Sequence, residues 1–327
     1  MTRTTTHAAP SAGANLVSGS PGFLDLSPAV AGASLMIAAG AVFAIVNTLV
    51  QYGGMSLGIA PARLAFWQYA IAFLFALPWI LRNGLSPFRT SIGTLHVVRV
   101  LLAVGGVQLW VFGLAHVPIW QAIALIMLSP FFVTLGAAVF LNETATPQRL
   151  AAVLVGFVGG MIVLAPWSDA FSTYALYPVG AAALWAFSSL LTKRMTATES
   201  ADTLTVYLLM LLTPLNAALA WGSDGLAIEV GGAGLLLLAI GLLTALAQWF
   251  LARAYTVADA TYLQPFDHVK LPFNVILGVV VFGFAPPGSM WIGSLLIVGA
   301  SFALLRAESR AASRRIAGQE ADTGAAA

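Results

Sequence analysis

The chain has 327 residues, of which 60% are hydrophobic and only 8% are charged, and its formal net charge is +2. Soluble domains carry about 25% charged residues, so this composition excludes a soluble globular protein and indicates a chain dissolved mainly in lipid. The absence of cysteine excludes disulfides and cysteine-ligated metal sites. The apolar runs are continuous, whereas the strands of a membrane β-barrel alternate, so an all-α membrane protein is predicted.

Residues 1–29 lack the apolar core of a cleavable signal peptide, and they are predicted to be a flexible cytoplasmic tail. Beyond them, turn residues and charges separate apolar runs of about 20 residues, the length that a spanning helix needs. A second cytoplasmic tail, basic and rich in alanine, is predicted at 307–327. Ten transmembrane helices are predicted between the tails, over residues 31–52, 62–82, 95–114, 119–140, 150–166, 174–193, 203–222, 233–254, 261–283 and 289–305.

The positive residues indicate an orientation, because cytoplasmic loops carry an excess of lysine and arginine. With the N-terminus inside and ten crossings, the outer loops receive only Arg63. Both termini are therefore predicted to be cytoplasmic, in a multi-pass protein of the cell inner membrane. The inner side then holds most of the positive side chains, namely Arg3, Arg82, Arg89, Arg149, Lys193, Arg194, Arg253, Arg306, Arg310, Arg314 and Arg315.

The two halves of the chain resemble each other at an offset of about 140 residues. Val-Gln-Leu-Trp at 107–110, in the third span, matches Ala-Gln-Trp-Phe at 247–250, in the eighth. Two five-helix repeats are therefore predicted, over 30–166 and 174–306, with chance similarity between apolar helices as the alternative. Because five is odd, the second repeat is inverted in the membrane, an arrangement typical of secondary transporters whose site lies near the midplane.

Several short motifs occur in a fixed order along the chain. They are Leu95-His96-Val97-Val98-Arg99, Leu128-Ser129-Pro130-Phe131-Phe132, Leu141-Asn142-Glu143, Gly156-Phe157-Val158-Gly159-Gly160 and Ala254-Tyr255 followed by Ala258-Asp259-Ala260-Thr261. In this order they resemble the EamA type of the drug/metabolite transporter superfamily, over about residues 30–306. The resemblance implies a ten-helix transporter. Pro265-Phe266 followed by polar residues resembles the S-adenosylmethionine and riboflavin carriers, and related members export amino acids.

Three departures from the family pattern leave the substrate open. The family usually has an arginine in the second span, where this chain has Gln68. The fourth helix of the second repeat usually ends in Gly-Glu, where this chain has Gly283-Phe284. The ninth span carries Asp267 and Lys270, where similar carriers place other polar or oppositely charged residues.

The polar segment Gln264-Pro265-Phe266-Asp267-His268-Val269-Lys270 is the strongest candidate for a substrate-binding site. Charges within the membrane are costly, about 2.5–3.5 kcal/mol on insertion scales, and usually face a cavity or a partner. Asp267 and Lys270 are three residues apart, so they share a helix face and can pair. They are expected to bind a polar substrate or to handle a coupling proton, the alternative being a structural ion pair near the inner surface. His268 is a candidate proton relay or a helix–helix hydrogen-bonding group.

Amides and aromatic rings in other spans complete the predicted substrate site. An amide in lipid needs a partner, so each is either a ligand-binding group or a hydrogen bond between helices. These candidates are Gln108, Gln248, Trp110, Trp249, Asn47, Gln51 and Gln68, with Trp67, Tyr177 and Trp185 as further cavity candidates. Arg99, four residues into the third span, is expected to mark the inner boundary by extending to the headgroups, the alternative being attraction of an anionic group.

Other classes of function fit the sequence less well. The stretch from Gly54 to Gly58 matches the G-x-S-x-G of serine hydrolases, but that motif needs a strand-to-helix turn and here follows a transmembrane helix. The two lysines do not follow a Walker A pattern, and no histidine, cysteine and carboxylate cluster has the spacing of a metal site. An intramembrane serine hydrolase and a lipid scramblase remain as alternatives of another class.

The sequence therefore predicts a secondary transporter, not an enzyme, that moves a small polar organic metabolite by alternating access. An amino acid or an amino-acid derivative is the first expectation. A vitamin or nucleoside-like solute, such as riboflavin or S-adenosylmethionine, is the alternative. The expected partners are the small-molecule substrate, membrane lipid and a coupling proton, with no nucleic acid, no metal and no cofactor.

Overall fold

The computed structural model describes residues 28–82, 90, 92–140, 146–169, 171–223, 225–227, 231–258 and 260–325. Residues 1–27 of the tail predicted over 1–29 and the motif Leu141-Asn142-Glu143 lie outside these residues, and the last two residues of that tail begin the first helix. The helices are α1 (Pro28–Met55), α2 (Pro61–Arg82), α3 (Gly93–Leu114), α4 (Ile119–Ile126), α5 (Ser129–Phe140), α6 (Pro147–Leu164), the short 3-10 helix η2 (Thr173–Ala175), α7 (Leu176–Met195), α8 (Ala201–Ser223), α9 (Gly232–Val257), α10 (Ala260–Asp267), α11 (Lys270–Phe282) and α12 (Gly288–Ala325).

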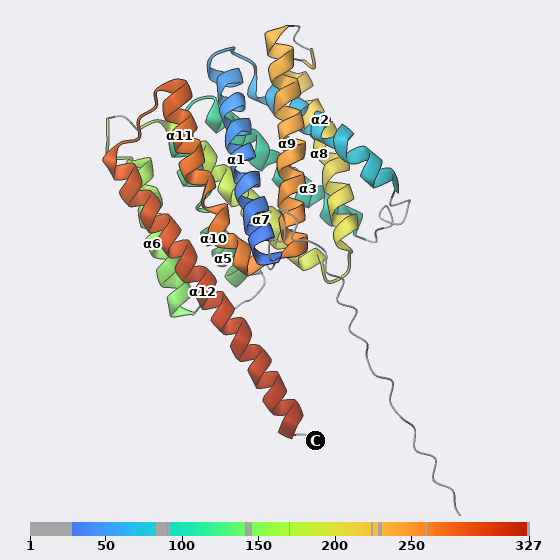
Figure 1. Ribbon diagram of the computed structural model, residues 1–327, viewed down its shortest axis with the longest axis vertical. Helices are drawn as coiled ribbons and strands as arrows, with labels where there is room; N and C mark the ends of the chain where they lie inside the picture. The colour runs from blue at the N-terminus through green and yellow to red at the C-terminus, as the bar shows by residue number, and fades with distance from the viewer. Residues whose placement is uncertain are drawn as a thin grey trace, which may run out of the picture.

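The predicted all-α membrane protein is confirmed. Among the described residues, nine helical segments are long and apolar enough to cross a membrane, and the segments over 119–140 and 265–282 each contain two helices. The remaining span is α2, a 22-residue helix that the sequence also predicts as a crossing. The C-terminal helix α12 continues past the bundle as a single rod (Figure 1).

The helices pack with an internal symmetry. In the first repeat α1 lies along α9 of the second, and in return α7 of the second repeat lies along α3 of the first. The fifth spans of the two repeats, α6 and α12, pack against each other, and so do the second spans, α2 and α8 (Figure 1). Exchanging each span with its counterpart therefore reproduces the main helix contacts, as two repeats related by a pseudo-two-fold axis require.

The contact between α6 and α12 shows how small residues hold the repeats together. A Cβ atom added at Gly159 would lie 2.7 Å from the carbonyl oxygen of Gly293, and one added at Gly293 would lie 2.6 Å from the carbonyl oxygen of Gly159. Helices in lipid associate by close backbone packing of this kind. Any larger side chain at either position would push the two spans apart.

Candidate functional site

Two spans that the sequence predicts as continuous are each broken in the middle. The fourth breaks between α4 and α5, at Met127 and Leu128, and the ninth breaks between α10 and α11, at His268 and Val269. A proline follows each break and supplies no N–H for the carbonyl one turn earlier. In the ninth span Pro272 is that residue, and the carbonyl of His268 instead accepts from the amide of Leu271 at 3.1 Å.

A cavity of about 790 Å³ lies between the two breaks. Discontinuous helices in equivalent positions of inverted repeats commonly form the substrate sites of secondary transporters. Polar and aromatic side chains from both repeats line its wall, namely Phe43, Asn47, Gln68, Tyr69, Trp110, Ser129, Thr134, Trp185, Gln248, Asp267, His268, Lys270 and Ser301. We call it the central cavity.

Asp267 and Lys270 form an ion pair at the edge of this cavity. The Nζ of Lys270 donates to Oδ2 of Asp267 at 2.6 Å, which confirms the pairing predicted from their spacing. Asp267 is the last residue of α10 and Lys270 is the first of α11. The side chains are 36% and 27% exposed, so both remain accessible to a solute in the cavity.

A chain of hydrogen bonds ties this break to α1. The Nδ2 of Asn47 donates to Oδ1 of Asn274 at 3.1 Å, and the Nδ2 of Asn274 donates to the carbonyl oxygen of Lys270 at 2.6 Å. Asn274 was not among the predicted site residues, although an amide one turn after Lys270 in an apolar span indicates a polar contact on the same helix face. The lysine is therefore positioned by two side chains that are nine-tenths or more buried.

His268 lies beside the ion pair and lines the central cavity. Both of its ring nitrogens are buried and have no hydrogen-bond partner among the described residues. Its ring contacts that of Phe302, with the centroids 5.3 Å apart. Buried polar atoms are normally satisfied, so a solute, a water molecule or a proton is the natural partner of this imidazole.

Aromatic rings and amides form part of the wall of the central cavity. The rings of Trp110 and Trp185 are 6.2 Å apart at 47°, and Nε1 of Trp185 donates to the carbonyl of Ala103 at 3.2 Å. The Nε2 of Gln68 donates to Oγ1 of Thr244 at 3.2 Å. This wall therefore presents planar faces beside amide groups, a lining suited to a flat polar ligand.

Several predicted site residues lie elsewhere. Gln108 bonds Oδ1 of Asn216 at 2.7 Å, as a link between α3 and α8. Gln51 is fully buried and donates to the carbonyls of Leu114 and Val117. Trp249 is 57% exposed on the outside of α9. The side chain of Gln264 lies outside the described residues.

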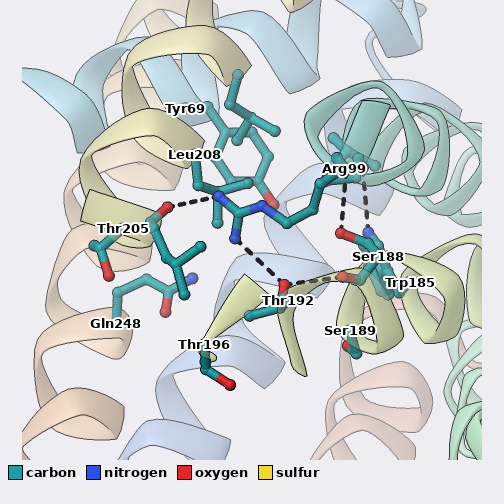
Figure 2. A pocket seen from close by; sticks show the side chains of 14 residues that line it. Tyr69, Arg99, Trp185, Ser188, Ser189, Thr192, Thr196, Thr205, Leu208 and Gln248 are labelled. Atoms are coloured by element: carbon teal, nitrogen blue, oxygen red, sulfur yellow. Dashed lines mark hydrogen bonds between the residues drawn. The ribbon is translucent and has the colours of Figure 1, made fainter. Parts of the chain in front are cut away.

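Arg99 does not extend to the headgroups, so that expectation was wrong. Only 3% of it is exposed, and it points into a second cavity of about 490 Å³ (Figure 2). Its Nη2 donates to the carbonyl of Leu204 at 2.6 Å, and its Nη1 donates to Oγ1 of Thr192 at 3.3 Å. The hydrogen-bond acceptors of α7 and α8 hold the side chain inside the bundle, because they satisfy donors that lipid would leave bare.

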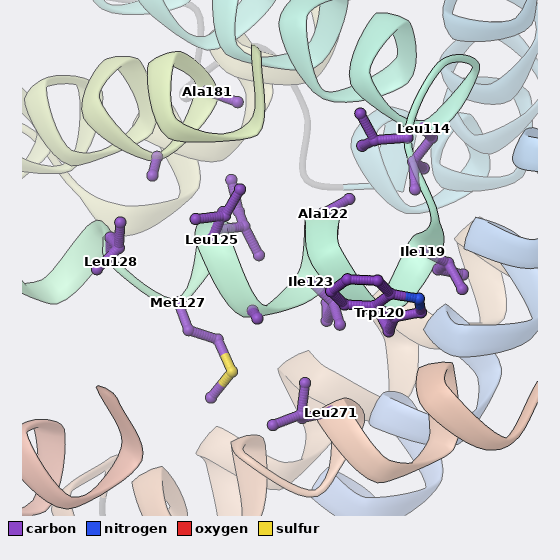
Figure 3. Close-up of a cluster of buried hydrophobic side chains, with 14 of the residues drawn as sticks. Leu114, Ile119, Trp120, Ala122, Ile123, Leu125, Met127, Leu128, Ala181 and Leu271 are labelled. Carbon is purple, nitrogen blue, oxygen red and sulfur yellow. The ribbon is translucent and has the colours of Figure 1, made fainter. Parts of the chain in front are cut away.

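The end of the bundle at which α1 and α3 end is closed by apolar packing. Leu114, Ile119 and Leu125 are fully buried there around α4 (Figure 3). The central cavity extends instead toward the other end, where it is lined by Met36 near the start of α1 and by Leu304 near the end of the membrane-spanning part of α12. The structure therefore has one end closed and a cavity reaching toward the end at which α1 begins.

Two segments of the chain match the same family model. The EamA-like transporter family matches residues 30–165 and again residues 172–306. The chain is 51% identical over 287 residues to a riboflavin transporter of Rhizobium johnstonii, covering 88% of this chain and 95% of that protein. It is 49% identical to a riboflavin transporter of Brucella anthropi, covering 84% and 98%. An S-adenosylmethionine uptake transporter of Rickettsia felis is 27% identical, with 77% and 85% covered.

Proposed function

The chain belongs to the EamA-like transporter family, and from this premise we propose that it carries riboflavin across the cell inner membrane by alternating access. It is a multi-pass transporter of a small molecule, not an enzyme. Ser56, the serine of the hydrolase-like motif, lies exposed in the turn after α1 and does not line the central cavity with His268. The serine of the hydrolase-like motif is therefore not placed beside His268 as a base.

One observation carries the choice of substrate. About half of the residues are identical to those of two proteins named riboflavin transporter, over nearly their whole length. The S-adenosylmethionine transporter is much less similar, at 27% identity. The relatives therefore favour the vitamin alternative over the amino-acid derivative that was the first expectation.

The lining of the central cavity supports this proposal. Riboflavin combines a flat three-ring system, an edge with two carbonyls flanking an N–H, and a chain of hydroxyls, and it is uncharged at neutral pH. Trp110, Trp185 and Tyr69 offer planar faces to such rings. Asp267 can accept from the N–H or from a hydroxyl, while Lys270 can donate to a carbonyl. The volume of about 790 Å³ falls in the range of about 300–1,000 Å³ typical of ligand pockets.

Transport requires the two ends of the bundle to open in turn. With both termini in the cytoplasm, as the positive residues predict, the central cavity faces the cytoplasm and the apolar cluster around α4 seals the opposite side. We propose that protonation near His268 and Asp267 couples uptake to the proton gradient, because their side chains share the cavity with the substrate. In proteoliposomes an imposed inward proton gradient then accelerates uptake by the wild type, and His268→Gln removes that acceleration.

Counterflow in proteoliposomes tests the substrate. Vesicles are loaded with an excess of unlabelled riboflavin, S-adenosylmethionine or mixed amino acids, and entry of the matching labelled solute is followed. Accumulation of labelled riboflavin alone is expected. Accumulation only with amino acids would restore the first expectation, and accumulation only with S-adenosylmethionine would assign the chain to the more distant relatives' activity.

A further inference from the structure

The second cavity adjoins the central cavity and holds a positive charge that the proposed riboflavin site does not use. It lies between α2, α3, α7, α8 and α9, and encloses about 490 Å³. Tyr69, Trp185 and Gln248 line both cavities. A single ligand can therefore occupy the central cavity and extend into this one, which we call the arginine chamber.

The guanidinium of Arg99 is only partly satisfied. It has five N–H donors, and the bonds to the Leu204 carbonyl and the Thr192 hydroxyl use two of them. The Nε atom is buried and has no partner among the described residues. The side chain crosses the chamber from α3, so its remaining donors are available to whatever occupies that space (Figure 2).

The charge of Arg99 also lacks a counter-ion in the described part of the chain. No carboxylate there lies within ion-pair distance of the guanidinium. Glu199, at the same end of the bundle, accepts from the hydroxyl of Thr90 at 2.6 Å. Charged groups inside a membrane usually pair or face a ligand pathway, so an anion is the partner that this site lacks.

The neighbouring hydroxyls are already used as donors. Thr192 donates to the carbonyl of Ser188 at 2.8 Å, and Ser188 donates to the carbonyl of Arg99 at 3.1 Å. The Ser188 bond joins α7 to α3, and the Thr192 bond within α7 directs the hydroxyl oxygen that accepts from Arg99. Neither bond neutralises the guanidinium. The chamber therefore has a fixed, planar, positively charged donor group and room beside it.

We propose that the arginine chamber is an anion subsite, which takes a phosphate monoester or a carboxylate attached to a ligand whose planar ring lies in the central cavity. This inference rests on the proposed function, because the ring is taken to be a flavin. Arginine binds such anions through parallel hydrogen bonds in a fixed geometry. Riboflavin 5′-phosphate has this combination, since a flexible hydroxylated chain separates its ring system from its phosphate.

Flavin fluorescence provides the test. The purified full chain in lipid nanodiscs is titrated with riboflavin and with riboflavin 5′-phosphate, and quenching of the flavin reports binding. The variants are Arg99→Gln, which removes the charge, and Arg99→Lys, which keeps the charge but not the fork. Asn216→Ala is the matched control, because it breaks the bond between Asn216 and Gln108, a different link between α3 and α8.

The proposal predicts that Arg99→Gln weakens binding of the phosphate ester about tenfold or more and binding of riboflavin less than about twofold, since only the ester uses the charged donors. Arg99→Lys should fall between. Inorganic phosphate at millimolar concentration should compete with the ester but leave riboflavin binding unchanged. If inorganic phosphate instead tightens the binding of riboflavin, free phosphate binds in the arginine chamber beside the vitamin. That result would also support the anion subsite.

Two results would overturn the anion subsite. One is that the wild type binds riboflavin but not its phosphate ester. The other is that Arg99→Gln weakens the binding of riboflavin and of its phosphate ester equally. If Asn216→Ala gave the same pattern, Arg99 would only hold α3 and α8 together. If riboflavin fails to bind while the ester binds through Arg99, the riboflavin proposal fails and the anion subsite remains.

Discussion

The two broken spans share a break that is followed by a proline, but the side chains at the first break are mostly apolar and those at the second are mostly charged. The first break, between α4 and α5, is formed by Met127, Leu128 and Ser129, whereas the second carries Asp267, His268 and Lys270. Both open onto the central cavity, from equivalent spans of the two repeats. The repeated fold therefore supplies the scaffold twice, while the charged side chains that line the central cavity come from the second repeat alone.

The helices at the two breaks also differ in burial: α4 is enclosed by protein, whereas one face of α11 is exposed. Nearly every residue of α4 is buried in protein, at the end that is closed. In α11, Ile276 and Val280 are 57% and 74% exposed on the face away from the bundle. Asp267, His268 and Lys270 line the cavity, whereas the exposed face of α11 is apolar, as a surface covered by lipid requires.

The largest effect is expected from neutralising one member of the ion pair. Lys270→Met or Asp267→Asn leaves the partner charge alone in the membrane, which costs about 2.5–3.5 kcal/mol on insertion scales. Riboflavin uptake per inserted protein should fall about tenfold or more, since that cost and the lost ligand contacts act together. Ser129→Ala, in the apolar break, is the matched control and should change uptake less than about twofold. Equal losses in both breaks would contradict the division of roles.

The next effect concerns the aromatic wall. A Cβ atom at Gly106 would collide with the indole of Trp185, so Gly106→Val must displace that ring from the cavity. Riboflavin affinity, measured by fluorescence quenching, should fall about fivefold, or about 1 kcal/mol, within the roughly 0.5–1.5 kcal/mol of an aromatic pair. Gly40→Ala is the control, because its Cβ would lie 3.6 Å from Cβ of Lys270, an ordinary contact. Unchanged affinity in Gly106→Val would remove Trp185 from the site.

A smaller effect is expected from the residue that positions the lysine. Asn274→Leu removes both the bond from Asn47 and the bond to the Lys270 carbonyl. Each hydrogen bond contributes about 0.5–1.5 kcal/mol, and part of this change should appear as an uptake rate about threefold lower with the protein still folded. Asn47→Ala should reproduce most of the loss. An additive double variant would show that the two amides act independently and not as a chain.

The smallest effect on transport is expected at the closed end. A substitution there should instead lower the stability of the protein. Gln51→Met leaves the carbonyls of Leu114 and Val117 without their donor. The free energy of unfolding should fall by about 1–3 kcal/mol, measured as a lower midpoint of thermal unfolding in detergent. Thr48→Val, which loses one bond to the carbonyl of Ala44 in the same helix, should cost less. A larger loss of unfolding free energy in Thr48→Val than in Gln51→Met would show that the bonds of Gln51 do not stabilise this end.

The sequence predicts the spans well, because hydropathy and turn residues mark where helices enter and leave lipid. It also predicts the pairing of Asp267 and Lys270, since a spacing of three fixes a shared face whatever the tertiary packing. The break at Met127 and Leu128 was not predicted. Apolar residues flank it, so only Pro130 distinguishes it from a continuous helix.

Residues that depend on helix rotation were harder to place. Trp249 and Trp185 look equally suited to a cavity in the sequence, yet one faces outward and the other inward, because packing sets the rotation of each helix. Arg99 lies near a span end, where arginines commonly extend to the headgroups. Only the acceptors on α7 and α8, which are far away in the sequence, reveal that it is held inside.

Protection of a single introduced cysteine would show whether riboflavin binds between the two breaks, and the experiment is simple because the chain contains no cysteine of its own. Ser129→Cys places a thiol in the central cavity between the two breaks, and its reaction with a maleimide is followed with and without ligand. Riboflavin at saturating concentration should slow the reaction severalfold, while amino acids leave it unchanged, and Lys270→Met should abolish the protection. Equal reaction rates with and without riboflavin, in a protein that transports it, would place the substrate elsewhere and contradict the account.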